Sequence, residues 1–141
     1  MELNEKIYNK IVELCEIGDE FAMNGEMDKA VEKFYEALNL LPKPKNDWEA
    51  ATWIYTAIGD SYYLDGKYEK AKEAFFEAMN CPDGISNSFI LLRQGEIMYE
   101  LNEKVRAVEF LLRAYMLEGK EIFDGEDNKY LKFLKENVEG I

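Results

Sequence analysis

The stretch DWEAATWIYTAIGDSYYLDGKYEKAKEAFFEAMNCP, residues 47–82, decides the fold. From Gly59 onward, small and bulky residues recur at fixed positions: Tyr62, Gly66, Ala71, Phe75 and Ala78. Two helices can approach closely only where their side chains are small, and large apolar side chains fill the space beside such a crossing. The stretch therefore predicts two antiparallel helices joined by a tight turn at Gly66.

The same spacing occurs twice more, starting from Gly18 and from Gly95. Each of these glycines is followed by a large apolar residue, an alanine, a bulky residue and a second alanine. These residues are Phe21, Ala30, Phe34 and Ala37 in the first copy and Met98, Ala107, Leu111 and Ala114 in the third. Because one helix pair cannot bury its own apolar face, the copies must stack. The sequence thus predicts an all-α repeat protein.

This pattern resembles the tetratricopeptide repeat (TPR), a unit of about 34 residues that consists of two helices. The resemblance implies an α-solenoid of three TPR helix pairs, wound as a right-handed superhelix, with a C-terminal capping helix. We expect a single TPR domain over residues 1–141. Its repeats should cover about residues 4–44, 45–82 and 85–119, and the capping segment should cover residues 120–141.

Apolar periodicity and turn residues predict where the helices begin and end. The expected helices cover about residues 4–24, 28–41, 47–64, 68–80, 87–101, 103–118 and 128–138. Asn46 and Glu49 have capping-box spacing, which predicts that Asn46 caps the third helix. Ser86 or Asn87 should cap the fifth. On the last helix, five apolar residues are expected to cover the third repeat: Tyr130, Leu131, Phe133, Leu134 and Val138.

Composition excludes several classes of function. The net charge of -12 argues against direct binding of nucleic acid, which requires clustered Lys and Arg. The same charge would steer a basic partner toward the surface, although it could also serve solubility alone. The chain has no His, and Cys15 and Cys81 therefore lack a His partner that could activate a thiolate. We expect a non-catalytic protein with no catalytic residues, no bound metal and no cofactor.

The chain also shows no signal for a membrane or a secretory route. The segment MELNEKIYNK at residues 1–10 mixes acidic and basic residues, and no stretch approaches the roughly 18 apolar residues of a membrane span. Two cysteines without short spacing fit reduced thiols rather than a disulfide framework. We therefore expect a cytoplasmic location and no contact with membranes.

One face of each first helix is expected to line the concave surface of the superhelix. This groove face comprises Val12, Cys15, Asp19 and Ala22, then Trp53, Thr56, Asp60 and Tyr63, then Phe89, Leu92, Glu96 and Tyr99. An acid follows every repeat glycine, so carboxylates alternate with aromatic anchors. The predicted partner-binding residues are Asp19, Trp53, Asp60, Tyr63, Phe89, Arg93, Glu96 and Tyr99. Such a surface suits a basic protein or peptide, because the carboxylates orient the partner and the aromatic side chains that it buries supply most of the binding energy.

The alternative for these residues is that the acids are merely solvated and that the aromatic side chains pack under the capping helix or the first-repeat loop. A carboxylate clamp of the kind that TPR chaperone adaptors use is not expected. Where the clamp requires cationic or amide residues, this chain has Cys15, Asp19, Ala57 and Phe89, and only Arg93 fits. One basic group among acids cannot hold a carboxylate against their repulsion.

A weaker resemblance concerns the stretches at residues 46–71, 80–101 and 113–134, which look like small stand-alone bacterial TPR proteins found near polymorphic toxin genes. This resemblance implies an immunity protein that covers a basic toxin. Two other functions remain open. One is a general scaffold or adaptor for short basic segments, and the other is a structural subunit that associates with itself as a homodimer.

Overall fold

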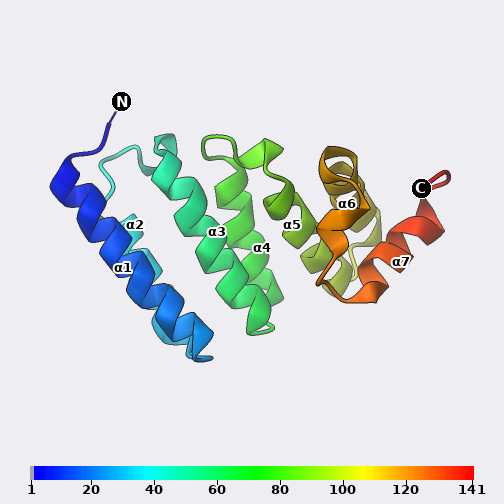
Figure 1. Cartoon of the computed structure of the whole chain (residues 1–141), viewed down its shortest axis with the longest axis horizontal. Coiled ribbons are helices and arrows are strands. Elements are labelled where there is room, and N and C mark those ends of the chain that lie inside the picture. The colour runs from blue at the N-terminus through cyan, green and yellow to red at the C-terminus, as the bar shows by residue number, and fades with distance from the viewer. Residues whose placement is uncertain (1) are drawn as a thin grey trace. The chain divides into compact units, whose positions relative to one another are not determined.

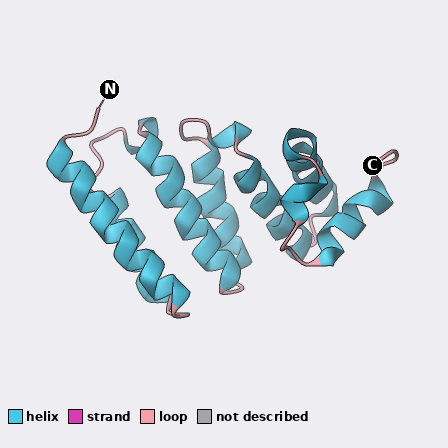
Figure 2. Ribbon diagram, viewed as in Figure 1, coloured by secondary structure: helices cyan, strands magenta, loops and turns pink. Residues whose placement is uncertain are grey.

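The computed structural model describes residues 2–141, and all regular secondary structure in that range is helical (Figure 2). The α-helices are α1 (Glu5–Met23), α2 (Met27–Leu38), α3 (Glu49–Leu64), α4 (Tyr68–Met79), α5 (Ser88–Glu100), α6 (Lys104–Glu118) and α7 (Asn128–Asn137). Short 3₁₀ turns are η1 (Lys45–Asp47), η2 (Gly84–Ser86) and η3 (Lys120–Phe123). The order of elements confirms three helix pairs followed by a capping helix.

The chain divides into two compact units, residues 1–85 and residues 86–141. The first unit contains α1 to α4, which are repeats one and two. The second contains α5, α6, η3 and α7, which are repeat three and the capping segment. In each unit the two helices of a repeat pack against one another as an antiparallel pair (Figure 1). The single domain expected over the whole chain stays a prediction.

Each helix pair crosses at its repeat glycine. A β-carbon added to this glycine would overlap a bulky side chain of the facing helix, at 2.6 Å for Gly18 and Phe34, 2.7 Å for Gly59 and Phe75, and 2.7 Å for Gly95 and Leu111. The repeat alanines are fully buried at the same crossings: Ala30, Ala37, Ala71, Ala78, Ala107 and Ala114. The spacing in the sequence therefore marks the points where the helices touch.

The helix boundaries agree with the predicted ones to within a few residues, but one cap differs. Asn46 does not cap α3. It lies in η1, where its Nδ2 donates a hydrogen bond of 2.9 Å to Oε2 of Glu77 on α4, and α3 begins after Trp48 without a side-chain cap. The 3₁₀ turn takes up the residues that a capping box would need. Asn87 does cap α5, because its Oδ1 accepts a hydrogen bond of 3.1 Å from the backbone N–H of Ile90.

Both cysteines are buried free thiols within the first unit. Burial, with a smaller contribution from Asp19, raises the pKa of the Cys15 thiol to about 12. Burial, with a smaller contribution from Glu77, raises the pKa of Cys81 to about 11. Both groups therefore stay protonated near neutral pH, and a thiol is a poor nucleophile. Within residues 2–141, no helix combines the length and apolar character needed to cross a membrane.

The crossing predicts a sharp contrast between two adjacent phenylalanines. Phe75 is 0% exposed against Gly59, whereas Phe76 is 41% exposed on the same helix. Replacing Phe75 by Ala should lower the free energy of unfolding by about 3–5 kcal/mol, because it leaves a cavity at the crossing. The matched Phe76→Ala variant should lose less than half as much. Urea unfolding followed by circular dichroism measures both, and equal losses would contradict the crossing.

Candidate partner-binding site

Much of the groove face remains accessible on the first unit, although Cys15, which was expected on this face, is buried in the core. Asp19 on α1 is exposed, and Trp53 on α3 is 39% exposed. Asp60 and Tyr63 are partly exposed further along α3, and the Tyr63 ring lies edge-on to Tyr68 with 5.9 Å between ring centroids. Partial burial, together with the nearby Glu16, raises the pKa of Asp19 above its ordinary value. The four site residues predicted in repeats one and two thus all reach the surface of this unit.

A cleft of about 540 Å³ opens at the amino-terminal ends of α1 and α3. We call it the aromatic cleft, and it is lined by Glu2, Leu3, Tyr8, Asp47, Trp48, Glu49, Ala50, Trp53 and Pro82. Three of these residues are acidic, three are aromatic and none is basic. Its volume falls in the range of about 300–1,000 Å³ typical of ligand sites. Of the predicted binding residues, only Trp53 lines this cleft.

Hydrogen bonds to loop carbonyls hold the walls of the aromatic cleft in place. The indole Nε1–H of Trp48 donates to the carbonyl oxygen of Pro42 at 2.8 Å. The Oγ1 hydroxyl of Thr52 donates to the carbonyl oxygen of Pro82, also at 2.8 Å. Both bonds fix loop segments against the first turns of α3. The cleft is therefore a preformed feature of the unit rather than a gap between mobile side chains.

Two residues of the cleft were missed although a signal for them existed. Tyr8 and Glu49 each lie ten residues before their repeat glycine, which is one further helical turn beyond Val12 and Trp53 on the groove face. Extending the spacing by that turn would have found both. Asp47, Trp48 and Pro82 belong to irregular segments or a 3₁₀ turn, where helical periodicity carries no information.

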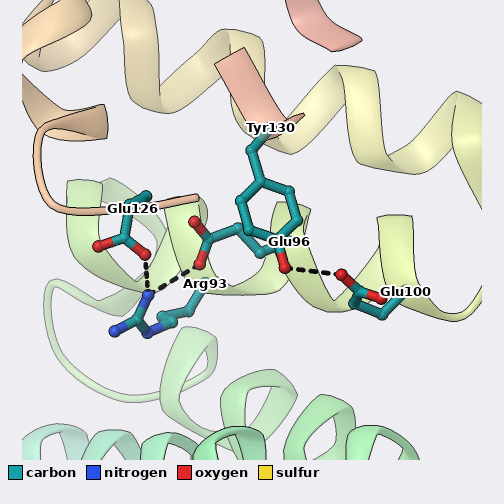
Figure 3. A network of polar contacts seen from close by, with 5 residues as sticks. All are labelled: Arg93, Glu96, Glu100, Glu126 and Tyr130. Carbon is teal, nitrogen blue, oxygen red and sulfur yellow. Dashed lines mark hydrogen bonds and ion pairs between the residues drawn. The ribbon is translucent and has the colours of Figure 1, made fainter. Parts of the chain in front are cut away.

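On the second unit the chain's own capping segment covers the groove face. Glu96 is 0% exposed, so it lies inside the protein rather than on the surface where the sequence placed it. Arg93 pairs with Glu96 at 2.8 Å and with Glu126, which comes from the loop before α7 (Figure 3). The side chain of Arg93 therefore ties α5 to the capping segment and is largely used within the chain.

The aromatic residue of this face is covered in the same way. The Tyr99 ring packs edge-on against Tyr130 and Phe133 of α7, with centroids 5.4 Å and 5.0 Å away. Nearby, Oε1 of Glu100 accepts a hydrogen bond of 2.7 Å from the hydroxyl of Tyr130 (Figure 3) and pairs with Lys129 at 2.7 Å. Packing under the capping helix, which was the alternative for the aromatic residues, is what the structure shows for Tyr99.

Phe89 is the most accessible of the predicted site residues in the second unit. It is 37% exposed, and the guanidinium carbon of Arg93 lies 4.9 Å from its ring centroid. Phe89 also lines a smaller cleft of about 350 Å³ with Ser88, Glu118, Glu121 and Ile122. The structure thus brings Phe89 and Arg93 together with buried Glu96, whereas Trp53 lies in the aromatic cleft of the first unit.

Burial gives Glu96 unusual acid–base properties. It raises the pKa of this carboxyl from an ordinary 4.5 to about 8, and the neighbouring Glu126 carboxyl adds to the increase while Arg93 opposes it. A carboxyl that keeps its proton near neutral pH favours the covered arrangement of the second unit. No cluster of three or more metal-binding side chains occurs within residues 2–141.

No protein-family model and no curated protein matches the chain. Among solved structures, it is similar to the Yersinia enterocolitica type III secretion chaperone SycD in complex with a peptide of the translocator YopD, with a TM-score of 0.74, 16% identity and coverage of 94% of this chain and 95% of that one. It is also similar to the second TPR domain of human RPAP3 in complex with the HSP70 peptide SGPTIEEVD (TM-score 0.71, 15% identity, 92% and 96% covered). A third similar structure is the N-terminal domain of stress-induced protein-1 from C. elegans, with a TM-score of 0.71, 15% identity and coverage of 94% of this chain and 98% of that one. The fold is therefore that of TPR domains.

The buried carboxyl predicts how stability depends on pH. Between pH 4.5 and about 8 the folded chain retains the Glu96 proton that the unfolded chain releases, so the free energy of unfolding should fall as pH rises through this window. Glu96→Gln should flatten that fall, because glutamine does not titrate. Glu109→Gln, at an exposed position on α6, is the matched control. Denaturant unfolding across this pH range checks it, and parallel curves for all three proteins would show that the Glu96 pKa is not raised.

Proposed function

We propose that the chain is a non-catalytic protein-interaction module that binds a basic segment of a partner protein on the groove face of α1 and α3. The observation that carries this proposal is the aromatic cleft together with Asp19 and Asp60. This part of the first unit combines carboxylates and large aromatic side chains, and no basic residue lines the cleft. Aromatic anchors supply energy and carboxylates supply orientation and rate of association.

The solved structures of similar fold support peptide binding, but the acidic surface of this chain favours a peptide of the opposite charge to the one bound to RPAP3. The HSP70 peptide bound to the human RPAP3 domain is SGPTIEEVD, which contains three acids and no basic residue. The groove face of this chain has acids at Asp19 and Asp60, and the net charge of -12 of the whole chain would also repel such a peptide. A basic segment is therefore the partner that this surface favours.

The particular role that we propose is that of a bacterial immunity protein, acting in the cytoplasm, that covers a basic toxin. A basic toxin would match the acidic surface, and one-to-one binding should be tight and sensitive to salt. A general adaptor would bind several basic segments more weakly. In both roles the groove face binds a basic partner.

Self-association is the second candidate, and one observation favours it. The outer side of α7 forms a shallow cleft lined by Asn128, Leu131, Lys132, Lys135 and Glu136. Its lysines have the charge that the acidic groove face of a second copy would attract. Sedimentation of the pure protein separates the candidates, because a stable dimer at micromolar concentration favours the structural subunit and a monomer favours a foreign partner.

Selection from a random peptide library displayed on phage tests the proposed function. Enriched peptides should be basic and should contain aromatic or aliphatic residues beside Lys or Arg. Affinity should fall as salt rises from 50 to 500 mM, about tenfold or more if several charges contribute. The double variant Asp19→Asn with Asp60→Asn should weaken binding. The control variant Glu20→Gln with Glu32→Gln removes the same charge from exposed sites off the groove face, and it should bind as the unchanged protein does. Enrichment of acidic or uncharged peptides would contradict the proposal.

A further inference from the structure

The aromatic cleft contains acids that the chain itself does not neutralise. The side chains of Asp47 and Glu49 are exposed at its rim, and within residues 2–141 neither one forms an ion pair. Many other acids in the chain do have such partners, for example Glu26 with Lys29 at 3.1 Å. The cleft thus concentrates negative charge beside the rings of Tyr8 and Trp53.

The aromatic residues of the cleft differ from several others in the chain in the same respect. At a number of other rings a basic group of the chain lies over the ring, as with Lys29 over Phe21 at 5.7 Å or Lys104 over Tyr99 at 3.4 Å. Further rings covered in this way are Tyr62, Phe89, Phe110, Tyr130 and Phe133. Among the described residues, no basic side chain lies over the rings of the cleft. No cation of the chain therefore occupies the negative faces of these rings.

We propose that the aromatic cleft is the binding pocket for an arginine side chain of the partner. This inference rests on the proposed function and specifies which side chain of the basic segment the cleft binds. A guanidinium is planar and weakly hydrated, so it can stack on an aromatic face while its N–H groups donate to carboxylates at the ring edge. Trp53 and Tyr8, which are 39% and 49% exposed, supply the faces, and Asp47 and Glu49 supply the acceptors.

Other features of the cleft fit this occupant. Trp48 is held by its hydrogen bond to Pro42, so it forms a fixed wall that loses little freedom on binding. The amino terminus of α3 would by itself disfavour a cation, but Glu49 lies in the first turn and offsets that positive end. The cleft of about 540 Å³ is larger than one side chain, and Leu3, Ala50 and Pro82 offer an apolar wall for a residue next to the arginine.

The two tryptophans allow a direct test. The chain contains two Trp residues, and both line the cleft, so intrinsic tryptophan fluorescence reports on this site. The probe is Nα-acetyl-arginine amide, titrated at constant ionic strength. Nα-acetyl-citrulline amide is the matched neutral control, because it has nearly the same shape without the charge. We expect a saturable change with the arginine probe and roughly tenfold weaker binding of the citrulline probe.

Variants then locate the binding. Asp47→Asn with Glu49→Gln should weaken the arginine probe roughly tenfold, whereas Glu20→Gln with Glu32→Gln, which changes net charge equally, should leave its affinity unchanged. Tyr8→Ala should also weaken it, and its circular dichroism spectrum shows whether the helices remain intact. Nα-acetyl-lysine amide should bind more weakly than the arginine probe, since an ammonium cannot stack as a plane.

Several results would overturn the inference: no saturable response to the arginine probe, equal binding of the citrulline probe, tighter binding of the lysine probe, or unchanged affinity in the cleft variant. None of them would by itself refute the proposed function. If basic peptides from the library still bind and still lose affinity when Asp19 and Asp60 are neutralised, the groove face binds them without an arginine pocket. If those peptides fail as well, both proposals fail together.

Discussion

The close approach of two helices at a glycine is the constraint on which the rest of the structure depends. In each pair a bulky residue of the second helix occupies the space where a β-carbon would otherwise lie, as Phe75 does at Gly59. This contact fixes how each first helix is rotated about its own axis, because the glycine must face its partner helix. The groove face is defined by positions counted from that glycine. The repeat glycine and the bulky residue that faces it therefore determine both where the two helices cross and which residues lie on the groove face.

The same rotation places equivalent residues on the groove face of every repeat, and the capping segment then makes the two units differ. On the first unit Asp19, Trp53 and Asp60 reach the surface, and the aromatic cleft opens beside them. On the second unit the equivalent acid, Glu96, is fully buried, and it contacts the partly exposed Arg93, which also pairs with Glu126. Burying an ionisable group is favourable only when its charge is neutralised, and here the raised pKa of the Glu96 carboxyl and the neighbouring guanidinium do so. The capping segment thus protects the end of the third repeat and occupies its groove face at the same time.

The helices, their pairing and the crossings could be predicted from the sequence, since glycine and alanine at fixed intervals have a direct steric meaning. Trp53 could be placed on an accessible face for the same reason. Two kinds of feature could not be predicted. Glu96 has the same spacing as Asp19 and Asp60, and its burial depends on a loop far along the chain that brings Glu126 to Arg93. The aromatic cleft draws Asp47, Trp48 and Pro82 from segments outside the repeat periodicity, where only the three-dimensional path of the chain brings them beside Tyr8. The role of Asn46 could not be predicted either. Its spacing from Glu49 favoured a capping box, but Asn46 lies in a 3₁₀ turn and donates a hydrogen bond to Glu77.

The groove face presents Asp19, Trp53 and Asp60 at the surface in repeats one and two, whereas the capping segment covers this face in repeat three. Carboxyl labelling of the free protein with a carbodiimide and glycine amide, read residue by residue by mass spectrometry, tests this difference most directly because no partner is needed. Asp19, Asp47 and Glu49 should react at rates close to those of other exposed acids such as Glu20. Glu96 should react much more slowly in the folded protein and as fast as the others after denaturation. Labelling of Glu96 at the rate of Asp19 in the folded protein would contradict the account, since it would mean that the capping segment does not cover the third repeat.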